Sequence, residues 1–250
     1  MKKILIHIVA IILVSSQLAA QYVLDNSGGK INNKGTIKVK NGQVNALPDT
    51  IGGRVEFLQQ RKGSQQVVPN IVYNQLVVAN NAKKIVADTR DQSNRVRNLV
   101  VLDSLIIAEG ADFTTRWIGL QPEDVIARST VVNRNARYDG PRDLRLSNEN
   151  APQNILANGQ FSRLNIDNPF GVNIVSGGFK INEKLTLSRG TLNNSETENF
   201  NMADSTEIER FTGSSLSVEP VFEGRVDVRY SGNGSIMASG ELPSNTNSLQ

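Results

Sequence analysis

Short segments of alternating apolar and polar residues recur along the chain, and this pattern constrains the fold most strongly. The segments include Val55-Glu56-Phe57, Val172-Asn173-Ile174, Leu185-Thr186-Leu187 and Val226-Asp227-Val228. Turn-forming residues such as Ser176-Gly177-Gly178 and Asn193-Asn194 separate them. Successive side chains of a β-strand point to opposite faces, so each segment has one buried and one solvated side. Helical spacing is weak, with a turn or two at most in 82–87 and 121–127. The sequence therefore predicts an all-β fold.

Similar segments recur in the same order and indicate an internal repeat. Gly53-Arg54-Val55-Glu56-Phe57 resembles Gly224-Arg225-Val226-Asp227-Val228. A second pair of similar segments is centred on Leu76 and Leu164, which lie 88 residues apart. We expect diverged repeats of this length, in which the paired segments occupy equivalent strands and direct their apolar residues to one buried face.

A repeat of this length, built from strand-sized pieces, fits two architectures. In a parallel β-helix or β-solenoid, about four coils of roughly 22 residues would fill one repeat. Successive coils would stack about 4.8 Å apart, and Asn side chains would form ladders between them. The alternative is a pair of tandem antiparallel β-sandwiches, one per repeat. We predict the solenoid, with an N-terminal cap and partial repeat at 21–75 and β repeats at 76–163 and 164–250.

The N-terminus has the layout of a secretory signal peptide. Met1-Lys2-Lys3 is basic, residues 4–14 are mostly apolar, and 15–20 are mostly small. The apolar run is much shorter than the ~20 residues of a membrane-spanning helix. We therefore expect a signal peptide at 1–20, a mature chain that begins near Gln21, and no stable membrane span after cleavage. The expected localisation is secreted or cell surface.

Missing residue types exclude several kinds of chemistry. The chain has no Cys, and its only His, His7, lies in the predicted signal peptide. Disulfides, Ser-His-Asp triads and the common zinc sites are therefore excluded from the mature chain. The 27 Lys and Arg residues exceed the 24 Asp and Glu residues by three, and loss of Lys2 and Lys3 reduces this excess to one. Nucleic-acid binding needs clustered positive charge, so we predict no nucleic-acid partner.

Three motifs occur between Phe161 and Gln250. They are Gly190-Thr191-Leu192-Asn193, the P-x-F-x-G-x-V-x-V-x-Y-x-G pattern from Pro220 to Gly232, and Gly240-Glu241-Leu242-Pro243. With these motifs, the stretch resembles the repeat of large secreted surface proteins of the Bacteroidota. The resemblance implies a parallel β-helix-like architecture, export across the outer membrane, and adhesive or extracellular-matrix roles. Such proteins usually end in a C-terminal sorting domain, and nothing of that kind precedes Gln250. We therefore expect the chain to be a fragment.

Several polar or aromatic residues are candidates for binding or structural roles. Asp88, Asp91 and Asn94 carry oxygen ligands that suit calcium, but the glycine and bidentate acid of a known calcium loop are lacking. A polar turn is the favoured interpretation. Trp117, the only tryptophan, is a candidate sugar platform, although a core or edge position is favoured.

Paired carboxylates are the candidates for glycosidase chemistry. The pairs are Glu123 with Asp124 and Asp139 with Asp143. Surface charge is the favoured interpretation, because neighbours in sequence need not face each other across a sugar. Tyr138 and Tyr230 each precede a glycine by two positions, and this recurrence indicates a structural role.

These observations predict a secreted structural or adhesive surface protein, or a fragment of one, that is not an enzyme. We assign no catalytic, cofactor-binding or metal-binding residues and expect no cofactor. One alternative is a carbohydrate-binding or polysaccharide-degrading β-helix protein, and another is a domain of a multidomain exported machine or a passive spacer. Expected partners are surface polysaccharide or other surface proteins. Self-association is also expected at an open C-terminal edge around 226–230, because exposed strand edges pair with other chains.

Overall fold

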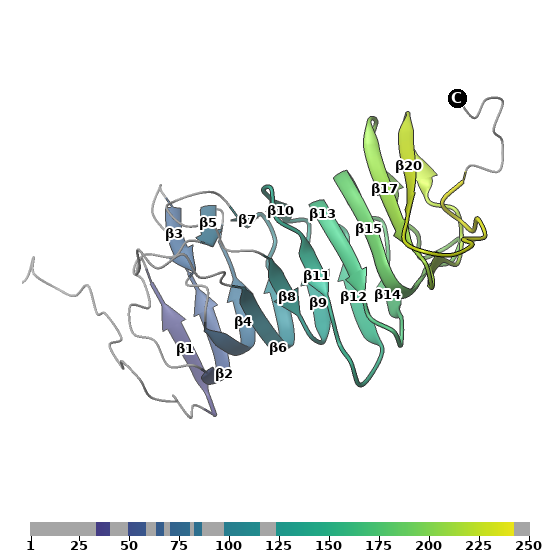
Figure 1. Ribbon diagram of the computed structural model, residues 1–250. Helices are drawn as coiled ribbons and strands as arrows, with labels where there is room; N and C mark the ends of the chain where they lie inside the picture. The colour runs from purple at the N-terminus through teal and green to yellow at the C-terminus, as the bar shows by residue number, and fades with distance from the viewer. Residues whose placement is uncertain are drawn as a thin grey trace, which may run out of the picture.

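The structure is a computed structural model that describes residues 34–40, 50–58, 64–67, 71–80, 83–86, 98–115 and 124–242. These segments contain 20 β-strands and no helix. Figure 1 shows the strands stacked along one axis, from β1 to β20. Neighbouring coils pair in parallel, as between β13 and β15, so the chain forms a β-solenoid of about seven turns. The all-β parallel solenoid is confirmed, and the tandem antiparallel sandwiches are wrong.

Each coil of the solenoid has three faces, and β15 (Lys180–Asn193) passes along all of them. On the first face Ile181 lies beside Met202 of the next coil, and on the second face Leu185 lies beside Ile208. On the third face Leu192 lies beside Leu216. Since the three parts of one strand stack on three different strands, the chain winds around a triangular core.

The remaining strands follow the same path. The first face contains β3 (Ser64–Val67), β5 (Lys83–Val86), β7 (Asp112–Thr114), β10 (Arg137–Asp139), the start of β13 (Gln160–Asp167), β16 (Asn201–Met202) and β19 (Val221–Phe222). The second face contains the starts of β2 (Thr50–Phe57), β4 (Val72–Val78) and β6 (Leu99–Ile107), then β8 (Val125–Ala127), β11 (Leu144–Leu146), the end of β13, β17 (Thr206–Phe211) and β20 (Val226–Ser231). The third face contains β1 (Thr36–Val39), the ends of β2, β4 and β6, then β9 (Thr130–Asn133), β12 (Gln153–Ala157), β14 (Val172–Ser176) and β18 (Ser214–Leu216). Because β5 and β8 are strands, the two weak helical candidates are wrong.

The core is one continuous apolar cluster that runs from Ile51 to Leu216. Aromatic rings stack between coils within it. On the first face Tyr138 lies in register with both Phe113 and Phe161, and its ring centroid is 5.8 Å from that of Phe113. The repeat boundaries predicted at 76 and 164 fall inside β4 and β13, so the core passes through them without a break.

The expected equivalence between recurring segments is wrong. Gly53–Phe57 ends on the third face, where Val55 lies in register with Leu76, whereas Gly224–Val228 leads into the second face, where Val228 lies beside Ile208. Val55 and Phe57 are nonetheless buried, and Val226 and Val228 pack against the core as partly buried residues. The inward direction of these apolar residues is therefore confirmed.

Coil geometry explains why the segments resemble each other without being equivalent. All three faces follow the same rule, with alternate residues pointing inward and a turn at each corner, so a short motif fits any of them. Coil length also varies, since Thr36 stacks on Arg54, 18 residues later, and Gln75 stacks on Ser104, 29 residues later.

Candidate functional site

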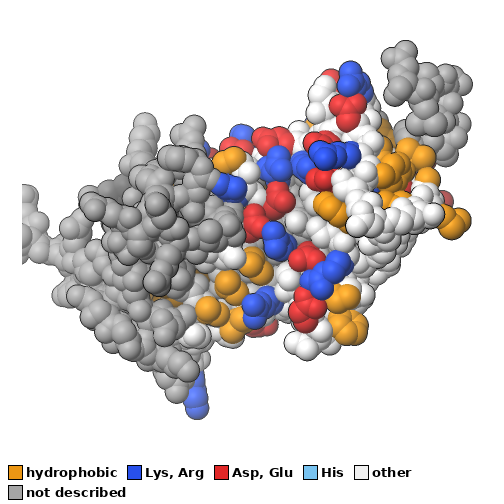
Figure 2. Space-filling model, in the orientation of Figure 1, with side chains coloured by type: hydrophobic (Ala, Val, Ile, Leu, Met, Phe, Trp, Pro, Cys, Tyr) orange, Lys and Arg blue, Asp and Glu red, His pale blue; other side chains and the backbone are white. Residues whose placement is uncertain are grey.

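The outward side of the second face changes character along the solenoid. Its central column, read coil by coil, contains Val72, Val100, Ile126, Arg145, Asn165, Thr186, Glu209 and Arg229. The column is apolar up to β8 and polar from β11 onward. We call the outward charged residues of the later strands the charged face; they are Arg145, Arg163, Lys184, Glu207, Glu209, Asp227 and Arg229, together with Asp143 just before β11. Figure 2 shows basic and acidic side chains interspersed across the visible surface.

Ion pairs on the charged face join neighbouring coils. Arg145 Nη2 lies 2.6 Å from Asp124 Oδ2 of the preceding coil. One coil further on, Arg163 Nε donates a hydrogen bond of 2.9 Å to Asp143 Oδ1. Two candidate carboxylates, Asp124 and Asp143, are therefore each paired with an arginine of a neighbouring coil.

Lys184 of β15 lies between two glutamates of β17. Its Nζ is 3.0 Å from Glu207 Oε1 and 2.6 Å from Glu209 Oε2. Burial alone would lower the pKa of Lys184, but hydrogen bonds and charge from Glu209 and Glu207 raise it. The Lys184 hydrogen bond in turn lowers the pKa of Glu209, although burial opposes this shift. Lys184 and Glu209 are therefore charged, and the ion pairs of Lys184 join β15 to β17 of the next coil.

The third candidate carboxylate, Asp139, is held ionised by its own coil and the next. It accepts hydrogen bonds from Ser162 Oγ at 2.9 Å and from the Gly140 backbone N–H at 2.8 Å. Burial raises its pKa, but Ser162 and Arg137 outweigh burial and the pKa is lowered. Every shifted carboxyl pKa in the described segments is shifted downward. A protonated general acid would need the opposite shift.

The two recurring tyrosines lie in different surroundings. Tyr138 is fully buried in the aromatic column of the first face, and its hydroxyl donates to the Arg142 carbonyl at 3.3 Å. Burial raises the pKa of Tyr138 well above its ordinary value. Tyr230 is 42% exposed on the second face, and its hydroxyl donates to Glu241 Oε1 at 3.0 Å. The structural role is therefore clear for Tyr138, but the two positions are not equivalent.

An amide ladder runs along the outward side of the third face. Asn193 Nδ2 donates to Asn173 Oδ1 at 2.9 Å, and Asn173 Nδ2 approaches Asn154 Oδ1 at 3.4 Å. Ser217 Oγ continues the ladder by donating to Asn193 Oδ1 at 3.2 Å. The sequence-based prediction of Asn ladders between parallel coils is confirmed.

A shallow pocket of about 300 Å³ lies where the third face turns into the first. Residues from three successive coils line it, namely Gly110 to Asp112, Asn135 to Arg137, and Asn158 to Gln160. Asn158 Oδ1 accepts a hydrogen bond of 2.7 Å from the Asn135 backbone N–H, which fixes one wall. The lining is polar and contains one acid and one arginine, so the pocket suits a small neutral polar group.

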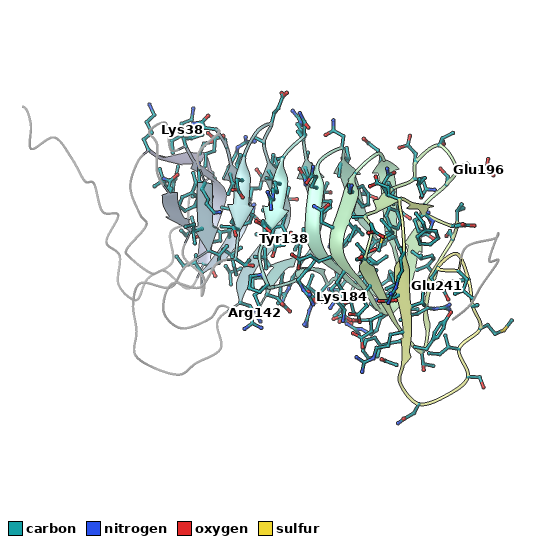
Figure 3. The ribbon with its side chains drawn as sticks, turned by 90° about the horizontal axis from the view of Figure 1, so that it is seen from above. Lys38, Tyr138, Arg142, Lys184, Glu196 and Glu241 are labelled. Atoms are coloured by element: carbon teal, nitrogen blue, oxygen red, sulfur yellow. The ribbon has the colours of Figure 1, made fainter. Side chains whose placement is uncertain are left out.

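A buried ion pair closes the last described coil, and one partner belongs to the Gly240-Glu241-Leu242-Pro243 motif, in which the sequence assigns no role to the carboxylate. Arg210 is 6% exposed and Glu241 is fully buried, and their side chains form a salt bridge. Ser239 donates its backbone N–H to Glu241 at 3.0 Å, and its hydroxyl also bonds the carboxylate. Burial raises the pKa of Glu241, but these hydrogen bonds and the one from Arg210 outweigh it. Figure 3 shows Glu241 near the C-terminal end of the described solenoid.

The remaining candidates and the predicted signal peptide lie outside the described residues. These candidates are Asp88, Asp91, Asn94, Trp117 and Glu123. Within the described segments, no group of three His, Cys, Asp or Glu residues has the arrangement of a metal site. No helix in that part of the chain is long and apolar enough to cross a membrane.

The fold defines a class, the parallel β-solenoid. Comparison with protein-family models, curated proteins and solved structures found no match.

Proposed function

We propose that this chain is a structural or adhesive protein of the cell surface, exported by the signal peptide at 1–20, and that it is not an enzyme. The observation that carries the proposal is the use of its charged side chains. On the charged face, Asp143, Lys184 and Glu209 each pair with a residue of a neighbouring coil. Charges used in this way strengthen an extended scaffold and are not poised for proton transfer.

The carboxylates support the same proposal. Asp124 and Asp143 each form an ion pair with an arginine. A glycosidase instead needs one carboxyl group that is protonated and one that is free to act as base or nucleophile. The downward pKa shifts of Asp139 and Glu209 favour permanent ionisation.

Three experiments test the proposal. N-terminal sequencing of exported protein should begin near Gln21, and antibody labelling of intact cells should detect the chain at the surface. Purified mature chain should show no turnover of polysaccharide, ester or peptide substrates. Hydrolase or lyase turnover that co-purifies with the protein and is lost in Asp143→Asn would overturn the non-enzymatic role.

A second candidate function is carbohydrate binding, and the pocket between the third and first faces favours it. Its lining combines amides of Asn135 and Asn158 with the guanidinium of Arg137, groups that hydrogen-bond to sugar hydroxyls. A glycan array with the mature chain tests this function, with Asn135→Ala as the pocket variant and Asn154→Ala of the amide ladder as the matched control. Binding lost only in the pocket variant would support it, and binding to no glycan would exclude it.

A further inference from the structure

β20 is the last strand that the structure describes on the second face, and among the described strands only β17 pairs with it. It pairs with β17 along its whole length, from Val226 beside Thr206 to Ser231 beside Phe211. An edge strand presents a row of N–H and C=O groups that another strand can pair with.

The sequence of β20 is self-complementary about its centre, with opposite charges on the two sides of Val228. Around Val228 the order is apolar, acidic, apolar, basic, apolar, from Val226 through Asp227 and Arg229 to Tyr230. If a second copy pairs antiparallel with β20 and the two-fold axis passes through Val228, Asp227 lies opposite Arg229 of the second copy. By symmetry Arg229 lies opposite Asp227 of the second copy. Val226 then faces Tyr230 of the second copy, so every opposed pair is favourable.

Other registers of this pairing are unfavourable. A two-fold axis at Asp227 or at Arg229 places like charges directly opposite each other, which destabilises a strand pair. An axis between two residues would place the inward side chains of one copy opposite the outward side chains of the other. The edge therefore selects a single register.

The side chains that this pairing needs are accessible. Asp227 is 61% exposed and Arg229 is 69% exposed. Arg229 Nε is 3.8 Å from Glu209 Oε1, a contact that leaves the guanidinium free to turn toward a second partner. Asp227 accepts hydrogen bonds from Arg225 of its own strand, the shortest of 2.9 Å. Exposed ion pairs contribute little stability, so Asp227 can exchange Arg225 for Arg229 of a second copy.

The apolar layer at this end favours the same occupant. Val226, Val228 and Phe222 pack against the core but are only partly buried, and Val221 is 51% exposed. An antiparallel pairing at β20 brings the corresponding layer of the second copy against this one. We propose that two copies associate tail to tail through antiparallel pairing of β20, centred on Val228, which continues the second face across both chains. An isologous contact of this kind closes as a dimer.

Charge reversal tests the proposed register. Sedimentation of the full mature chain should show a monomer–dimer equilibrium. Asp227→Arg alone and Arg229→Asp alone should each weaken the dimer about 10- to 100-fold, because the two-fold axis doubles every like-charge pair. An equimolar mixture of the two variants should form a heterodimer, since every opposed pair is again Arg with Asp. The double variant Asp227→Arg with Arg229→Asp should dimerise as the natural chain does.

Arg137→Asp is the matched control. Arg137 is an exposed strand residue that pairs with an acid two positions later, as Arg225 does with Asp227, but β10 is paired on both sides, with β7 and β13. This variant should dimerise normally. A second measurement needs no charge change: Val228→Cys, in a chain without other cysteines, should form a disulfide-linked dimer on mild oxidation.

Several results would overturn the proposal. They are a monomer at every concentration, single charge variants that dimerise as tightly as the natural chain, a mixture that fails to form the heterodimer, and growth beyond the dimer. The last outcome would indicate head-to-tail stacking instead.

Discussion

The early coils around β4 to β8 and the late coils around β15 to β20 follow the same path but carry opposite chemistry on the second face. The outward column is Val100 and Ile126 in the early coils, and Glu209 and Arg229 in the late ones. The inward residues of both regions are apolar and belong to one core. The inward layer and the backbone ladder therefore define a coil, whereas the outward residues differ between regions.

The two regions also accommodate buried charge differently. Lys84 in the early coils is fully buried, and desolvation lowers its pKa to about 8. In the late coils Arg210 and Glu241 are buried as an ion pair with added hydrogen bonds. Burial weakens proton binding by Lys84, whereas Arg210 and Glu241 compensate each other's charge.

The largest expected effect is loss of the buried pair in the late coils. Arg210→Met leaves the Glu241 carboxylate buried without its cation and should destabilise this end by about 3–5 kcal/mol. Hydrogen exchange should accelerate in 206–242 and stay unchanged in 99–107. Adding Glu241→Gln should restore part of the protection, and equal acceleration in both regions would show that the solenoid does not open locally.

Acid should act on the same end. The pKa of Glu241 in the folded chain lies below its ordinary value of 4.5, so the carboxylate stabilises the fold above that pH and less as the pH falls below it. The same exchange experiment should show 206–242 opening first on acidification, and Glu241→Gln should weaken this pH dependence.

A corner of the late coils gives the next largest effect. Gly190 has φ +75°, and a Cβ added there would lie 1.9 Å from the Asn168 carbonyl oxygen. Gly190→Ala combines left-handed strain with a clash against backbone, so it should destabilise the chain by about 2–4 kcal/mol in denaturant titration. Gly213→Ala is the matched control, because Gly213 has φ +83° but no atom within 4 Å of the added Cβ. A similar loss in both variants would show that strain alone, and not the close approach, requires Gly190.

Removal of the buried lysine should have a smaller effect of opposite sign in the early coils. Between pH 8 and 10.5 the unfolded chain binds more protons at Lys84 than the folded chain, so this residue makes stability rise with pH. Lys84→Met should therefore stabilise the chain at pH 7 by about 1–3 kcal/mol and remove this contribution. Urea titrations of both proteins at pH 7 and pH 10 measure it, and an unchanged pH dependence would contradict the account.

Salt should have the smallest effect and should separate the two regions. Ion pairs that are partly exposed contribute about 1 kcal/mol or less and are screened by salt. Added NaCl should speed hydrogen exchange in 184–211, where Lys184, Glu207 and Glu209 meet, but not in 99–107. Lys184→Met should abolish most of this difference, and equal sensitivity in both regions would argue against a specialised charged face.

The sequence predicted the strands and their inward-facing residues better than it predicted which strands stack on one another. Alternation such as Val172-Asn173-Ile174 predicted strands, and the abundance of Asn predicted ladders such as Asn173 with Asn193. The equivalence of recurring segments failed because one local rule serves all three faces. The ion pair of Arg210 with Glu241 could not be predicted, since it joins residues 31 positions apart across a corner whose geometry depends on coil length.

Distances measured from coil to coil are the strongest test of a continuous parallel solenoid. The chain has no cysteine, so spin labels attach only at introduced sites. Arg229→Cys combined in turn with Arg145→Cys, Ile126→Cys and Val100→Cys samples one column of the second face. With the labelled chain diluted in unlabelled protein, electron paramagnetic resonance should give distances of about 19, 24 and 29 Å, since each coil adds about 4.8 Å. Distances that fail to lengthen by equal steps from one pair to the next would contradict the solenoid.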